Sequence, residues 1–246
     1  MPLSANTLIH FTSSSGNLKG ILRDNFHVFN CKEEVVLNGK LGTYYVPMVS
    51  FCDIPLSEIK EHISKYGSYG IGLTKDWGMK NGLNPVLYMA PDSTLSSSYR
   101  SALAYFNPKK DGENGWNDAQ KSLLDIARYL KNYEGKLTRQ GITNKNYRYS
   151  DEREWRFVPP YSSDCEMLLV EEITKPEIKK AADEKLTMLR LRFEPNDIKY
   201  IIIKDDSEIS GFIEYLRNVK GRTYTMHDIE RLTTRILTTE QIRDDI

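Results

Sequence analysis

The stretch Tyr69-Gly70-Ile71-Gly72-Leu73-Thr74 is the clearest structural signal in the chain. Its large apolar side chains recur at every second position, which predicts a β-strand because successive side chains of a strand point to opposite faces. The other face carries Gly70, Gly72 and Thr74 and is almost bare. Glycine weakens a strand, so its repeated use predicts the close approach of another backbone or of a ligand.

A second strand is predicted at Thr7–Thr12, close to the start of the chain. Alternation places His10 and Thr12 together on the face opposite the apolar side chains. A helix over 17–23 should follow, because residues 13–16 offer capping side chains and the next apolar residues recur at helical spacing. The strand therefore presents one polar pair on one face.

A third strand is predicted at Glu152–Val158, where Pro159 ends it. Alternation places three charged side chains, Glu152, Glu154 and Arg156, on a single face. Two interpretations stay open at this point. The charged face is either an ordinary solvated surface or part of a functional site.

The remaining elements are an irregular mixture of strands and helices, with a hairpin or an irregular excursion between residues 24 and 45. Further strands are predicted at Val46–Cys52, Pro85–Met89, Leu186–Phe193 and Tyr200–Ile203. Helices are predicted from Ser57 to an end at Gly67, from Asp92 or Ser93 to Phe106, from a capping box at Asn117 to Leu130, from Ser207 to Leu216, and from Thr225 to Ile236. Surface loops are predicted at Asn107–Gly115 and Gly135–Tyr149.

This order favours an α+β fold, with a mixed and mainly antiparallel β core flanked by helices, over a regular alternation of strands and helices. No internal repeat and no low-complexity tract divides the sequence. We therefore predict one α+β domain over residues 1–220 and a helical extension over 221–246.

The composition limits the classes of function. The chain has 246 residues, and 34 basic side chains balance 34 acidic ones, so no general charge excess indicates nucleic-acid binding. Purely aliphatic runs such as Ile201–Ile203 are far shorter than a membrane helix requires, and we predict a cytoplasmic protein without a membrane partner. The signatures of P-loop NTPases, dinucleotide-binding dehydrogenases, serine hydrolases and zinc proteases are missing from the sequence.

The three cysteines are widely spaced and form no paired motif. A zinc site could use His10, Cys52 and His62, with Cys31 or Asp53 as the remaining ligand, but the irregular spacing favours buried thiols and hydrogen-bonded histidines. A nucleophile and base pair made of Cys52 and His62 is a further alternative. We therefore predict no metal ion.

A more specific set of residues joins the polar strand at the start, the tyrosines around Gly67 and the acidic strand after residue 151. Cleavage of the N-glycosidic bond of a nicotinamide dinucleotide requires a carboxylate to stabilise the cationic transition state. It also needs an aromatic ring against the departing base. These segments supply both kinds of side chain.

At these residues the chain resembles the AbiGi family of bacterial phage-resistance proteins. The resemblance covers about residues 7–205, and its most specific block is Phe51-Cys52-Asp53-Ile54-Pro55. The other matching segments are Leu8–Thr12, Asn17–Leu22, His62–Leu73 and Glu152–Arg156. The family is described as an antitoxin of a two-gene system, which implies abortive infection as the function and a cognate toxin as the partner.

The His10-x-Thr12 opening also resembles that of DarT-like proteins, which implies an ADP-ribosyltransferase-like fold with NAD in a cleft. The resemblance implies that His10 contacts a ribose and that Glu154 and Tyr69 are catalytic. The residues that it places around NAD are His10, Thr12, Tyr66, Glu152 and Arg156. The sequence departs from this pattern because it has no Ser-Thr-Ser strand motif, although Glu152-x-Glu154 matches the acidic motif.

Two functional hypotheses follow from the sequence, beside the plain alternative of a globular scaffold with no cleft around His10 and Glu154. The first is an NAD-dependent ADP-ribosyltransferase-like enzyme that modifies a macromolecule, either a protein or a nucleic acid, in phage defence. The second is a non-enzymatic antitoxin or sensor that binds a toxin, a phage component or nucleic acid. For the second, Arg139, Lys145, Tyr147 and Arg148 would suit a phosphate-contacting loop, and a solvated loop is the plain alternative.

Overall fold

The computed structural model describes residues 5–106, 117–139, 141–162, 164–169, 175–221 and 223–245. Contacts within the chain divide it into two compact units, and each is discontinuous in sequence. Unit 1 comprises Met1–His27, Val49–Asn84 and Arg190–Ile246, and unit 2 comprises Val28–Met48 and Pro85–Leu189. The sequence predicted a single domain over 1–220, and the two units are described separately below.

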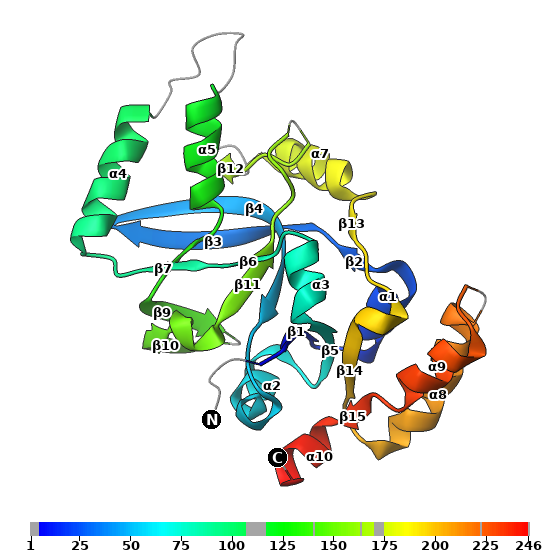
Figure 1. Cartoon of the computed structure of the whole chain (residues 1–246). Helices are drawn as coiled ribbons and strands as arrows, with labels where there is room; N and C mark the ends of the chain where they lie inside the picture. The colour runs from blue at the N-terminus through cyan, green and yellow to red at the C-terminus, as the bar shows by residue number, and fades with distance from the viewer. Residues whose placement is uncertain are drawn as a thin grey trace. The chain divides into compact units, whose positions relative to one another are not determined.

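Unit 1 is built on a sheet whose central strands are the two that the sequence predicted at Thr7–Thr12 and Tyr69–Thr74. Strand β1 (Thr7–Thr12) pairs antiparallel with β5 (Tyr69–Thr74), and β5 pairs antiparallel with β14 (Ile198–Ile203). Strand β15 (Ile236–Thr238) is parallel to β14 at the edge (Figure 1). The segment 221–246, predicted to be a helical extension, therefore also contributes a strand to this sheet.

The bare face of β5 is covered by protein side chains. A Cβ atom added at Gly72 would lie 2.9 Å from Cγ2 of Thr7 and 3.0 Å from Cδ2 of Tyr200. A Cβ added at Gly70 would lie 3.1 Å from the backbone oxygen of His10. Of the two explanations that the sequence left open for these glycines, close packing within the sheet is the one that the structure supports.

Helices pack around this sheet and enclose an isoleucine-rich core. The core cluster consists of Ile9, Ile54, Ile59, Ile63, Ile202 and Ile242. The helices of unit 1 are α1 (Ser15–Asp24), α2 (Lys60–Tyr66), α3 (Lys75–Lys80), α8 (Ile209–Lys220), α9 (Met226–Thr233) and α10 (Thr239–Asp245). Its short 3-10 turns are η1 (Leu56–Glu58), η4 (Pro195–Asp197) and η5 (Asp206–Glu208). A two-stranded ribbon joins β2 (Phe26–His27) to β13 (Arg190–Leu191).

Unit 2 contains a long hairpin in the segment 24–45, where the sequence predicted either a hairpin or an irregular excursion. Strand β3 (Phe29–Leu37) turns through Asn38-Gly39 into β4 (Lys40–Cys52), whose first nine residues belong to this unit. Asn38 and Gly39 both have positive φ, the backbone conformation that a tight two-residue turn requires. The short strand β12 (Leu168–Leu169) pairs with β4 at Tyr44 and Tyr45.

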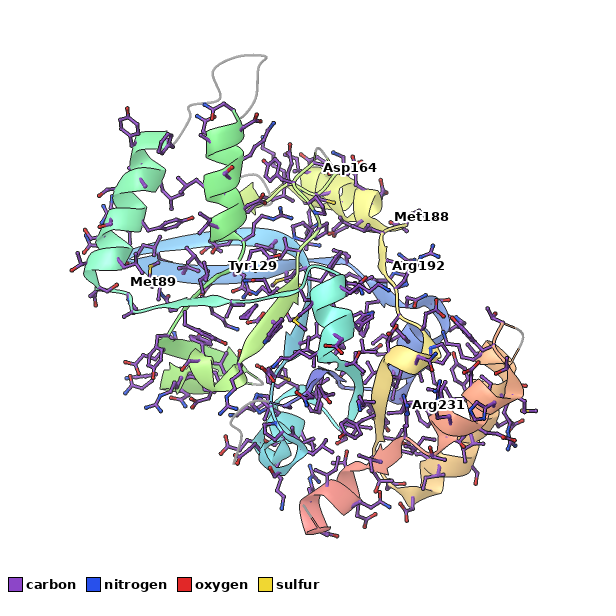
Figure 2. The ribbon with its side chains drawn as sticks, in the orientation of Figure 1. Met89, Tyr129, Asp164, Met188, Arg192 and Arg231 are labelled. Atoms are coloured by element: carbon purple, nitrogen blue, oxygen red, sulfur yellow. The ribbon has the colours of Figure 1, made fainter. Side chains whose placement is uncertain are left out.

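The other elements of unit 2 are strands β7 (Leu87–Met89), β8 (Leu130–Asn132), β9 (Glu134–Arg139), β10 (Ile142–Arg148) and β11 (Glu154–Phe157), and helices α4 (Thr94–Phe106), α5 (Asp118–Ala127) and α7 (Pro176–Leu186). The 3-10 turn η3 (Tyr149–Glu152) precedes β11, and β6 (Asn84–Pro85) lies at the boundary of the units. Met89 belongs to the apolar core cluster of this unit, and Tyr129 packs against it; both are labelled in Figure 2.

Several predicted elements need correction. The segment Gly135–Tyr149, predicted to be a loop, forms most of the β9–β10 hairpin. The prediction missed these strands because the alternating residues are polar rather than apolar. Within the strand predicted at Leu186–Phe193, only Arg190–Leu191 forms a strand in the structure. Asp205, not Ser207, caps the turn before α8.

Two predicted helices also end earlier than their apolar residues suggested. The helix predicted to reach Leu130 ends at Ala127, and the one predicted to reach Ile236 ends at Thr233. In both cases the last apolar residue belongs to the strand that follows, β8 or β15.

The capping box predicted at Asn117 is confirmed. Thr225 opens the last predicted helix as expected, and it also forms a capping box with Asp228. The surface loop predicted at Asn107–Gly115 lies outside the described residues. No helix in the described part of the chain is long and apolar enough to cross a membrane.

Candidate functional site

The charged residues of the third predicted strand form a buried ion-pair network in unit 2. The strand predicted at Glu152–Val158 is shorter in the structure, where β11 covers Glu154–Phe157 and Glu152 ends the 3-10 turn before it. Glu154 and Arg156 lie on the same face of β11. Arg153, which lies between Glu152 and Glu154, adopts a left-handed backbone conformation with φ of 43°. Glu152 and Glu154 are each 6% exposed and Arg156 is fully buried, so the alternative of a solvated charged face is wrong.

Lys131 of β8 joins the two carboxylates. Its Nζ atom lies 2.7 Å from Oε2 of Glu152 and 2.6 Å from Oε2 of Glu154. Nε of Arg156 lies 2.7 Å from Oε1 of Glu154, so both carboxylate oxygens of Glu154 have a cationic partner. Arg156 also pairs with Glu33 of β3 at 3.1 Å. Burial of these charges is tolerated because each is paired and hydrogen-bonded.

The electrostatics of the network follow from its geometry. Burial alone would raise the pKa of Glu154, but the ion pairs with Arg156 and Lys131 outweigh burial and hold that pKa well below its usual range. Burial would likewise lower the pKa of Lys131, and the neighbouring carboxylates reverse the direction and raise it. For Glu33, burial prevails over the attraction of Arg156 and raises the pKa. Glu154 is therefore an ionised, fully partnered carboxylate at neutral pH.

Tyrosines surround this network. The Glu154 backbone N–H donates to Oη of Tyr88 at 2.9 Å, and the Tyr147 hydroxyl donates to Oε1 of Glu152 at 3.1 Å. The ring of Tyr149 lies 5.2 Å from Nζ of Lys131, within the range of a cation–π contact. The tyrosines therefore contact three parts of the network: the Glu154 backbone, the Glu152 carboxylate and the Lys131 ammonium group.

The other half of the predicted site lies in unit 1. Alternation predicted that His10 and Thr12 share a face. The register pairs Thr12 with Tyr69 and His10 with Ile71, so Tyr69 lies on that face of the sheet as well. His10 donates from Nδ1 to the backbone oxygen of Ser50 at 2.8 Å.

The ring of His10 packs edge-on against Phe26 and Phe51. Burial lowers the pKa of His10, and the bond to Ser50 opposes that shift. The neutral form of the imidazole is therefore favoured.

The remaining predicted residues of unit 1 also have protein partners. Oγ1 of Thr12 accepts a hydrogen bond from Asn17 at 2.9 Å, and the Tyr69 hydroxyl donates to Glu208 at 2.8 Å. Burial and the Glu208 carboxylate raise the pKa of Tyr69 to about 12. The ring of Tyr66 stacks on His62 with centroids 5.7 Å apart.

Three of the side chains that the sequence placed around NAD hydrogen-bond to other protein groups. Nδ1 of His10 and the hydroxyl of Tyr69 donate to protein oxygens, and Oγ1 of Thr12 accepts from Asn17. Tyr66 and the residues just named belong to unit 1, and Glu152, Glu154 and Arg156 belong to unit 2.

The zinc alternative gains no support. Among the residues that the structure describes, no three His, Cys, Asp or Glu side chains are grouped so that they could hold a metal ion. Oδ2 of Asp53 lies 2.6 Å from Nζ of Lys75, and Sγ of Cys52 donates to the backbone oxygen of Ile9 at 3.2 Å. Cys31 belongs to unit 2, whereas the other candidate ligands belong to unit 1.

Sequence reasoning missed two members of the ion network, Lys131 and Glu33. Both lie on strands distant in sequence from β11, and neither belongs to a motif. The sequence therefore offered no signal for either residue.

Comparisons with known proteins agree on a single family. Residues 18–204 match a family model described as "Putative abortive phage resistance protein AbiGi, antitoxin". The chain is 26% identical over 232 residues to the abortive phage resistance protein AbiGi of Lactococcus lactis subsp. cremoris, which covers 85% of this chain and 92% of that protein. No solved structure matches the chain significantly. Because the family model spans most of its length, the chain belongs to the AbiGi family of abortive phage resistance proteins.

Proposed function

We propose that this protein is the antitoxin of a two-component phage-defence system and that it acts by binding its cognate toxin, without chemistry of its own at Glu154. The family that the chain matches is described as an antitoxin, and an antitoxin acts by neutralising a toxin. The observation that carries the non-enzymatic part is the pairing of both Glu154 oxygens, one with Arg156 and one with Lys131.

A catalytic carboxylate must meet the charge that develops in the substrate. Glu154 is buried and already neutralised by two cations, so a substrate would have to displace Lys131 or Arg156 from it. Removing one partner of a buried ion pair typically costs about 3–5 kcal/mol, which opposes such an exchange. These contacts support a structural role for Glu154.

The competing prediction is an NAD-dependent ADP-ribosyltransferase-like enzyme. The common face of His10, Thr12 and Tyr69 is the observation that favours it. Tyr69→Phe separates the two proposals, because the phenylalanine keeps the ring and removes the hydroxyl that the enzymatic prediction places in catalysis. Wild type and Tyr69→Phe would each be titrated with NAD by calorimetry and assayed for release of nicotinamide.

The test of the antitoxin proposal is growth of cells that express the toxin encoded beside this gene. Co-expression of the wild type should restore growth, and Tyr69→Phe should restore it equally. Restoration by the wild type that is lost in Tyr69→Phe, together with NAD consumption by the wild type alone, would contradict the proposal. Thermal melting of the wild type and of Tyr69→Phe shows whether any loss of growth restoration comes from unfolding of the variant.

A further inference from the structure

The β9–β10 hairpin of unit 2 is a cationic ribbon that the proposed function does not use. Residues 134–148 contain four basic side chains and one acidic side chain, whereas the chain as a whole is neutral. The strands pair antiparallel from Arg148 opposite Glu134 to Ile142 opposite Arg139. Gly141 forms the turn with φ of 79°, a conformation that glycine adopts without strain.

The register separates a polar face from a more apolar one. Thr138 lies opposite Thr143, and their hydroxyl oxygens are 3.0 Å apart. Alternation places Lys136 on the same face, and Arg148, opposite Glu134, also lies there. All four of these Lys, Arg and Thr side chains are exposed.

The opposite face of the ribbon carries the half-buried Leu137 and the buried Tyr147. Lys145 is exposed and lies in the register shift between Asn144 and Tyr147. The amide oxygen of Asn144 accepts the backbone N–H of Asn146 and shapes that irregular step.

Two tyrosines anchor the ribbon to the ion network. The hydroxyl of Tyr147 donates to Glu152, and the hydroxyl of Tyr149 donates to the backbone oxygen of Lys136 at 2.7 Å. The rings of these tyrosines pack edge to face, with centroids 5.2 Å apart. The network thus holds the base of the ribbon in place, which gives its buried charges a structural purpose.

Arg148 is oriented as well. Its guanidinium lies 6.0 Å from the centroid of the exposed Tyr133 ring, at the limit of a cation–π contact. An arginine held in this way loses less conformational entropy when it binds an anion. Together with Lys136 and Lys145, it gives the ribbon three exposed cations beside hydroxyl and amide groups.

We propose that the β9–β10 ribbon binds double-stranded DNA, with Lys136, Lys145 and Arg148 on backbone phosphates. The major groove of B-form DNA admits a two-stranded β-ribbon. Lysine, arginine, threonine and asparagine side chains are those that contact phosphates and base edges. The deep, narrow major groove of duplex RNA excludes such a ribbon, so DNA is the duplex that fits.

The experiment measures binding of the full chain to a fluorescent mixed-sequence DNA duplex and to the matching RNA duplex over a series of salt concentrations. The variant K136Q/K145Q/R148Q removes the three ribbon charges. The matched control K179Q/K180Q/K185Q removes three charges from α7 in the same unit. Circular dichroism and thermal melting establish whether both variants fold. If the triple ribbon variant does not fold, the single variant K145Q replaces it in the binding measurement.

Each phosphate contact contributes about 0.9 to the slope of log affinity against log salt concentration, so the ribbon variant should lose about 2.7 of that slope. Its affinity for DNA should fall at least about tenfold at low salt, while the α7 control keeps the affinity of the wild type. Equal losses in the two variants would overturn the proposal. Tighter binding of the RNA duplex than of DNA, or no binding of either by the wild type, would overturn it as well.

Discussion

Nζ of Lys131 lies 2.6 Å from Oε2 of Glu154, although the two residues come from separate strands of unit 2. This contact changes the interpretation of the acidic motif. A Glu-x-Glu pair on a strand suggested either a catalytic carboxylate or a solvated face. The buried pairing makes it the centre of an ion network that joins β8, β11 and the turn η3 and also reaches β3 through Glu33. Its consequences are open to measurement.

Replacing Lys131 with methionine should destabilise the protein strongly. The substitution leaves Glu152 and Glu154 buried without their shared cation, a loss that typically costs about 3–5 kcal/mol. Urea unfolding of the wild type and the variant measures the change. Lys121→Met is the matched control, because Lys121 makes only a 3.6 Å surface pair with Asp118, and it should shift stability by less than about 1 kcal/mol. Equal effects of the two substitutions would contradict the network.

Stability should fall at acid pH because of Glu154. Burial opposes its ionisation, but Arg156 and Lys131 hold its folded-state pKa below the ordinary value of 4.5. The unfolded state then binds the proton more readily, so the contribution is fully present above about pH 5 and is lost as the pH falls below that. Glu154→Gln removes the titrating group and should flatten the dependence of unfolding free energy on pH between about 5 and 3. An unchanged slope in the variant would show that other carboxylates are responsible.

The two glycines Gly72 and Gly20 should respond to alanine in opposite directions. The new methyl group at Gly72 would lie 2.9 Å from Thr7 and 3.0 Å from Tyr200, and such overpacking costs about 1–3 kcal/mol. Gly20 lies within α1 with nothing within 4 Å of an added Cβ, so alanine there should stabilise by about 0.5–1 kcal/mol. Thermal melting of both variants tests the close packing of β5, and a neutral Gly72→Ala would contradict it.

Local patterns in the sequence predicted much of the architecture. The alternation in Thr7–Thr12 and Tyr69–Thr74 located two central strands, and the capping box at Asn117 located α5. The β9–β10 hairpin was missed because its alternating residues are lysine, threonine and asparagine, which have no hydrophobic period.

The partners in the candidate site were beyond reach of such patterns. Lys131 and Glu33 meet β11 only through tertiary contacts, and no spacing rule connects them to Glu154. The alternation did place Glu154 and Arg156 on one face, but it carried no sign of whether that face was solvated or buried. Burial depends on which strands and tyrosines cover the face.

The account is tested most directly by mixing the purified chain with the purified toxin encoded by the neighbouring gene and measuring binding by calorimetry. We predict a saturable complex that forms without NAD and that Tyr69→Phe leaves unchanged. No heat of binding to that toxin, together with saturable binding of NAD that Tyr69→Phe abolishes, would contradict it.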